Sequence, residues 1–137
     1  MLVAISVVAL PSCSSGGGTS AAPSTTSTTS AAALAQRPAT AAEVATNMRK
    51  IEQIAQQVSQ SAGTNKAKAV SLDAQIEPLW RPIEATVRLN DQDTYLALED
   101  GFAALEQAAN EGNAAVAAKG SAGITSTVQA YLAKYSG

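Results

Sequence analysis

The sequence predicts an all-α protein, and three observations support this prediction. From Thr40 onward, apolar residues recur at intervals of three and four, the spacing of one face of an α-helix. Residues that cap helices, and glycines where helices can end, divide this region into segments. No stretch has the pattern of a strand hairpin. We therefore expect an up-down-up-down antiparallel four-helix bundle over residues 41–137, after a disordered N-terminal linker.

The first predicted helix follows Thr40. The run Thr40-Ala41-Ala42-Glu43 has the pattern of a capping box, in which a threonine and a glutamate satisfy each other's backbone amides. Gly63 is a natural stop for this helix. Its apolar face consists of Val44, Met48, Ile51, Ala55 and Val58.

The second predicted helix starts near Thr64 and Asn65 and contains two prolines. Pro78 and Pro82 each lack a backbone amide donor, so we expect a kink, or a break and restart, near residues 75–78. The apolar face of this helix consists of Leu72, Ile76, Leu79, Ile83 and Val87.

The third and fourth helices are separated by Glu111-Gly112-Asn113, which predicts an end, a turn and a new cap. Asn90 and Asp91 are both suitable caps for the start of the third helix. Helices of about 20–25 residues with short connections favour antiparallel neighbours. The two apolar faces are Tyr95, Leu98, Phe102, Leu105 and Ala109, and Ile124, Val128, Tyr131, Leu132 and Tyr135.

Composition excludes several classes of function. The 137 residues include no histidine and one cysteine, which rules out Ser-His-Asp and Cys-His triads and imidazole zinc sites. The net charge is −2 and no basic stripe is present, so we expect no nucleic-acid partner. No serine or threonine has an identifiable base partner. We expect a protein that is not an enzyme.

The N-terminus predicts export. Residues 1–10 are apolar and uncharged, too short to span a bilayer but typical of the core of a signal peptide. The following Leu10-Pro11-Ser12-Cys13 resembles the lipobox of bacterial lipoproteins. This resemblance implies a signal peptide over residues 1–12 and a lipidated Cys13, which would anchor the chain on the extracytoplasmic face of the cell membrane. The alternative is an ordinary signal peptide with an incidental cysteine.

A tether connects Cys13 to the helices. Residues 14–40 contain six Ser, six Thr, seven Ala, three Gly and two Pro, and cannot bury enough apolar surface to fold. We expect residues 13–40 to form a lipidated, disordered tether with a root-mean-square reach of roughly 30 Å.

Negative charge is concentrated in the second and third helices. Residues 70–111 contain nine acidic and two basic residues, a local net charge of −9 + 2 = −7. Asp73, Glu77, Trp80 and Glu84 share one flank of the second helix, and Tyr95, Glu99, Phe102 and Glu106 share one flank of the third. A turn at Asn90-Asp91 places Glu84 opposite Glu99, Glu77 opposite Glu106, and Trp80 near Phe102.

Two layers of facing carboxylates can bind a hard cation through oxygen ligands alone. The alternative is an ordinary solvated face, because Glu77 and Arg81, and Glu84 and Arg88, are spaced to form i,i+4 ion pairs. Trp80, the only tryptophan, is either a core residue or a ligand platform.

Three segments resemble a known group of proteins. They are residues 76–88 (IEPLWRPIEATVR) with Asn90-Asp91, residues 95–106 (YLALEDGFAALE) and residues 130–133 (AYLA). Together they resemble small extracytoplasmic helical domains of bacterial high-affinity iron-uptake proteins, such as the soluble N-terminal part of iron permeases. The resemblance implies a role in handling iron outside the cytoplasm, with Glu84, Glu99 and Asp100 as the matching acidic positions.

These observations lead to one functional hypothesis and one alternative. The hypothesis is a non-enzymatic surface lipoprotein whose acidic helical hairpin binds iron or another hard cation and delivers it to a membrane permease or other envelope protein. The candidate metal ligands are Glu77, Glu84, Glu99, Asp100 and Glu106. The alternative is an envelope protein–protein interaction module with no metal.

Overall fold

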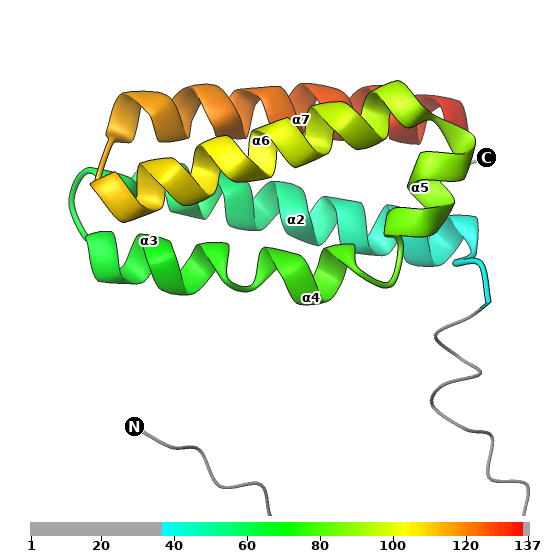
Figure 1. The fold of residues 1–137 in the computed structure, drawn as a ribbon, viewed down its shortest axis with the longest axis horizontal. Helices are drawn as coiled ribbons and strands as arrows, with labels where there is room; N and C mark the ends of the chain where they lie inside the picture. The colour runs from blue at the N-terminus through cyan, green and yellow to red at the C-terminus, as the bar shows by residue number, and fades with distance from the viewer. Residues whose placement is uncertain (1–36, 136–137) are drawn as a thin grey trace, which may run out of the picture.

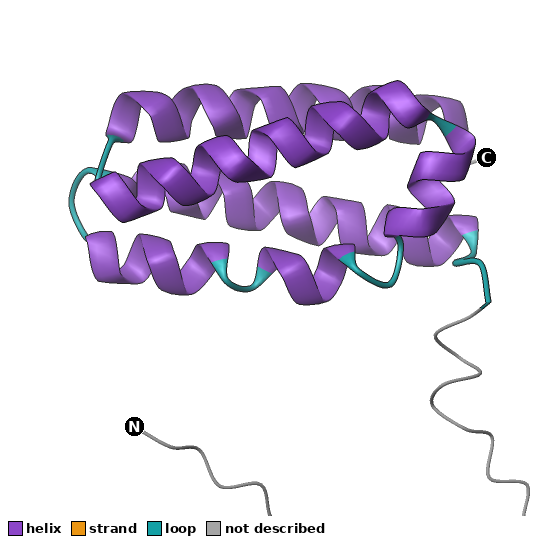
Figure 2. Cartoon of the chain, viewed as in Figure 1, coloured by secondary structure: helices purple, strands orange, loops and turns teal. Residues whose placement is uncertain are grey.

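A computed structural model describes residues 37–135, and within them it contains only helices and their connections (Figures 1 and 2). The predicted all-α class is confirmed for this part of the chain. The predicted signal peptide, Cys13 and most of the tether lie outside the described residues. The helices are α2 (Ala41–Ala62), α3 (Lys66–Asp73), α4 (Ile76–Trp80), α5 (Glu84–Asn90), α6 (Gln92–Glu111) and α7 (Ala114–Tyr135).

Within residues 37–135 no helix combines the length and the apolar character needed to cross a membrane.

The helix ends follow the predicted capping residues. Thr40 and Glu43 form the reciprocal capping box of α2, with the Thr40 amide 2.8 Å from the Glu43 carboxylate. The Asp91 side chain caps α6 by accepting from the Thr94 amide at 3.1 Å. Gly112 ends α6 with φ +72°, a left-handed conformation that favours glycine.

The second predicted helix is three separate helices. The predicted break near residues 75–78 is present between α3 and α4, but a second break over residues 81–83 was not predicted. Pro82 has no amide to donate to the carbonyl four residues earlier, so the helix cannot continue through it. Just after it, the Ile83 amide donates to the Trp80 carbonyl at 2.9 Å rather than to Leu79, and the Asn47 side chain donates to the Leu79 carbonyl at 3.0 Å.

The helices pack side by side around a single core. Helix α7 packs on α2 and α6, while α3 packs between α2 and α6. Helices α3 and α4 follow one another along α2, and α5 lies at the end of the molecule where α2 begins and α7 ends (Figure 1). The largest fully buried side chains are Met48, Ile51, Val58, Ile83, Val87, Leu98, Leu105, Ile124 and Val128, all on predicted apolar faces.

Two glycines differ in what an added methyl group would meet. A Cβ atom on Gly101 would lie 2.7 Å from Cγ1 of the buried Ile124, whereas one on Gly123 would meet nothing within 4 Å. We expect Gly101→Ala to lower the free energy of unfolding by about 1 kcal/mol, because overpacking exceeds the gain in helix propensity. Gly123→Ala should raise it by about 0.5–1 kcal/mol. Urea unfolding of both variants tests this; equal effects would contradict the α6–α7 packing.

Candidate cation-binding hollow

An open hollow of about 250 Å³ lies at the surface between α3, α4 and α6, and we call it the acidic hollow. Three helices supply the side chains around it. Its carboxylates are Asp73, Glu77, Glu99 and Glu106, and its aromatic lining is Trp80 and Phe102.

Trp80 forms the aromatic wall of the acidic hollow and is itself only 2% exposed. Its ring stacks against Tyr95 at 6.2 Å between centroids and meets Phe102 edge-on at 5.3 Å. The indole Nε1 donates a hydrogen bond to Glu99 Oε1 at 2.6 Å, a short bond to a charged acceptor. Trp80 therefore belongs to the core, and it also fixes the position of the Glu99 carboxylate.

Asp73 is the carboxylate whose surroundings oppose its charge most clearly. Burial raises the pKa of Asp73 from 3.8 to about 6, and repulsion from Glu106 adds to this rise. A raised carboxyl pKa indicates that desolvation and like charge outweigh any nearby positive charge. At neutral pH the hollow therefore concentrates negative charge that a bound cation would stabilise.

Glu77 has a partner at the surface. Its Oε1 accepts from Arg81 Nη2 at 2.9 Å, the predicted i,i+4 ion pair, with side chains 62% and 75% exposed. Exposed pairs of this kind contribute little to stability, so Glu77 can leave Arg81 at small cost. Arg88, by contrast, lies over the Tyr95 ring, 5.7 Å from its centroid.

The acidic hollow brings together three of the five predicted ligands. Glu77, Glu99 and Glu106 line it, and Trp80 lies against Phe102 as expected. Glu84 and Asp100 do not line it. Glu84 starts α5, beyond the unpredicted break at residues 81–83, so Glu99 faces Trp80 rather than Glu84.

Asp100 is excluded from the hollow by helix geometry. It follows Glu99 by one residue, which turns its side chain about 100° around α6. Asp73 lines the hollow but was absent from the predicted ligands. The signal for Asp73 was present in the sequence, because it lies four residues before Glu77 on the same flank.

Within residues 37–135 no group of three or more carboxylate or thiol side chains is placed to hold a metal ion as the side chains stand. A cation in the acidic hollow would have to be coordinated after side-chain movement or through its own water molecules. Glu77 and Glu106 are exposed, and Glu77 can turn once it leaves Arg81, whereas Asp73 and Glu99 are partly buried.

Comparison of this chain with protein-family models, curated proteins and solved structures found no match.

Proposed function

We propose that this chain is a non-enzymatic surface lipoprotein that binds a metal cation in the acidic hollow and delivers it to a partner in the membrane. The observation that carries the proposal is the convergence of four carboxylates from three helices on one hollow. Burial, and to a lesser degree repulsion from Glu106, raises the pKa of Asp73, and a bound cation would stabilise the Asp73 carboxylate against both effects.

The chemistry of the hollow favours a hard cation. Its lining offers carboxylate oxygens and no imidazole or thiolate, the ligand set suited to hard ions. The resemblance to iron-uptake domains favours iron among these ions, and a membrane permease as the acceptor. The cation would be cargo rather than a permanent cofactor. The site should therefore form only when a cation arrives and exposed Glu77 and Glu106 turn toward Asp73 and Glu99.

We propose in addition a topology for the helices and a location for the protein at the membrane. We infer that α3, α4 and α5 together take the place of the second helix in an up-down-up-down four-helix bundle. We also infer that a lipid on Cys13 and the tether hold this bundle at the extracytoplasmic face of the membrane. This arrangement would place the acidic hollow within tether reach of a membrane partner.

A second candidate function is docking of an envelope protein without any metal. It is favoured by the lack, within the described residues, of three groups already placed around one ion position. A lysine or arginine of a partner protein would be attracted by the same carboxylates. The two candidates differ in whether a free cation alone stabilises the chain.

Thermal melts of the full-length chain with ferrous, ferric, manganese, calcium, copper and zinc salts separate the two candidates. A cation at one hundred times its Kd stabilises by about 2.7 kcal/mol, a rise of order 10 °C for a domain of this size. We expect a selective rise for one cation or a few. A flat response across the panel would contradict cation binding and favour docking.

Two double variants with the same change in charge make the melts specific to the hollow. Glu99→Gln with Glu106→Gln removes two carboxylates that line it, and should abolish the cation-dependent rise. Glu84→Gln with Asp100→Asn removes two carboxylates outside it, and should leave the rise intact. Equal losses in both double variants would indicate nonspecific attraction by net charge.

A further inference from the structure

A second and larger hollow, of about 470 Å³, lies where the chain enters α2, and we call it the entry hollow. Its apolar lining is supplied by Ala39 and Ala42 on one side and by Pro82 and Ile83 on the other. Ala39 and Ala42 flank the start of α2, and Pro82 and Ile83 lie in the break between α4 and α5. The entry hollow is separate from the acidic hollow and shares no lining residue with it.

The break at Pro82 explains why the entry hollow exists. Helix α4 stops at Trp80 and α5 restarts at Glu84, so no continuous helix covers this part of α2. Asn47, which also lines the hollow, bonds to the Leu79 carbonyl and so holds the break against α2. The apolar surface left between the two sides is open to an occupant.

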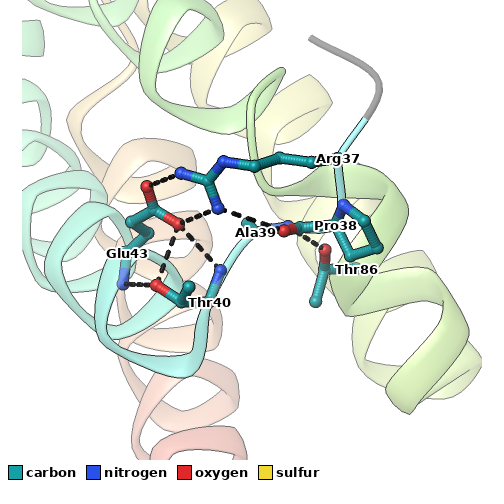
Figure 3. Close-up of polar contacts among 6 residues, drawn as sticks. All are labelled: Arg37, Pro38, Ala39, Thr40, Glu43 and Thr86. Atoms are coloured by element: carbon teal, nitrogen blue, oxygen red, sulfur yellow. Dashed lines mark hydrogen bonds and ion pairs between the residues drawn. The ribbon is translucent and has the colours of Figure 1, made fainter. Parts of the chain in front are cut away.

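The chain itself is held at the rim of the entry hollow (Figure 3). The Arg37 guanidinium pairs with the Glu43 carboxylate, and both residues line the hollow. The Ala39 amide donates to Thr86 Oγ1 at 2.9 Å, which ties the entering chain to α5. Arg37, the first residue that the structure describes, is therefore fixed at this rim.

The sequence directly before Arg37 contains one apolar residue of suitable size. Leu34 is the only large apolar residue among residues 14–36, and alanines precede and follow it. Two residues lie between it and Arg37, and these three steps along the chain span at most about 10 Å when extended. A covalently attached side chain also has a high effective concentration near the hollow, which favours it over a free ligand.

We propose that Leu34 and its flanking alanines occupy the entry hollow, so that the tether docks on the bundle before it leaves for the membrane. Burial of the leucine side chain against exposed Ala42 and Pro82 and partly buried Ala39 provides the driving force. Docking at Leu34 leaves about twenty free residues back to Cys13, a reach of roughly 25 Å. The tether would then leave from one fixed side of the bundle, and this holds whether or not the acidic hollow binds a cation.

Methyl-labelled nuclear magnetic resonance tests the contact directly. In the full-length chain with Cys13→Ser, we expect nuclear Overhauser effects between the Leu34 methyl groups and those of Ala39 and Ala42, which line the hollow. Contacts from another apolar residue, such as Leu10, in place of Leu34 would overturn the proposal. So would Leu34 methyl groups that contact only their neighbours in sequence.

Melts of tether variants test whether the contact stabilises the fold. We expect Leu34→Ser to lower Tm by about 5 °C, because it removes the buried apolar side chain. Leu34→Met should retain most of the wild-type Tm, since it is apolar and similar in size. Ala22→Ser is the matched control and should leave Tm unchanged. A Tm for Leu34→Ser equal to that of the control would overturn the proposal.

Discussion

Trp80→Ala is expected to lower the free energy of unfolding by about 3–5 kcal/mol, the range for removing a large buried aromatic side chain. Trp80 is almost fully buried and contacts the rings of Tyr95 and Phe102. Its loss would leave a cavity where α4 meets α6. A small domain has a total stability of only about 5–15 kcal/mol, so urea unfolding should show a large shift or a chain that is partly unfolded in water.

Trp80→Phe is the control that separates packing from hydrogen bonding. It keeps an aromatic ring in the core but removes the Nε1 donor that holds Glu99. We expect a smaller loss of stability than for Trp80→Ala, together with a weaker response to the cation that stabilises the wild type. If Trp80→Ala cost less than about 1 kcal/mol, the placement of Trp80 in the core would be wrong.

Stability should fall as the pH rises through the pKa of Asp73. The folded chain holds a proton on Asp73 up to about pH 6, whereas the carboxyl of the unfolded chain loses it near the ordinary value of 3.8. The favourable contribution is therefore fully present below about pH 4 and is lost as the pH rises through 6. Because Asp73 is only partly buried, we expect the loss to be about 1–2 kcal/mol.

Asp73→Asn removes this ionisation and tests the prediction. The variant should be more stable than the wild type at pH 7 by about 1–2 kcal/mol, with the difference shrinking toward pH 4. Urea unfolding at pH 4, 5, 6 and 7 measures it, with Asp100→Asn, which removes an exposed carboxylate outside the hollow, as the matched variant. Because Glu77, Glu99 and Glu106 also line the hollow, Glu106→Gln should reduce the same pH dependence in part. A difference that does not vary with pH would contradict the raised pKa of Asp73.

The sequence predicted the helix ends well because local chemistry determines them. Thr40, Asp91 and Gly112 each satisfy backbone groups within a few residues, so their roles can be recognised without tertiary information. The apolar stripe from Val44 to Val58 is buried as predicted, because its spacing alone defines one helix face.

Two prolines predicted a single kink or break near residues 75–78, whereas the structure has two breaks, at residues 74–75 and 81–83. Pro78 lies within α4, in the first turn, where a missing amide is tolerated, whereas the chain is no longer helical at Pro82. Which proline a helix tolerates depends on where the helix restarts, and here tertiary contacts such as Asn47 with Leu79 contribute to that choice.

The same break explains why the structure brings only three of the five predicted ligands to one hollow. The prediction assumed a straight second helix facing the third, which placed Glu84 opposite Glu99. Because α5 is a separate helix that starts after residues 81–83, Glu84 does not line the acidic hollow. The carboxylates that share the hollow with Glu99 and Glu106 are Asp73 and Glu77 instead. Side-chain spacing predicted a carboxylate cluster, but the identity of its members required the path of the backbone.

Titration of the full-length chain at pH 7 and pH 5 tests most directly whether the acidic hollow binds a cation. Each salt of the panel would be added while following heat and the emission of Trp80, the only tryptophan, whose Nε1 contacts Glu99. We predict one ion per chain and a change in Trp80 emission. Affinity should be at least tenfold weaker at pH 5, where Asp73 holds its proton. No heat and no emission change at millimolar concentrations of every cation would contradict cation binding in the hollow.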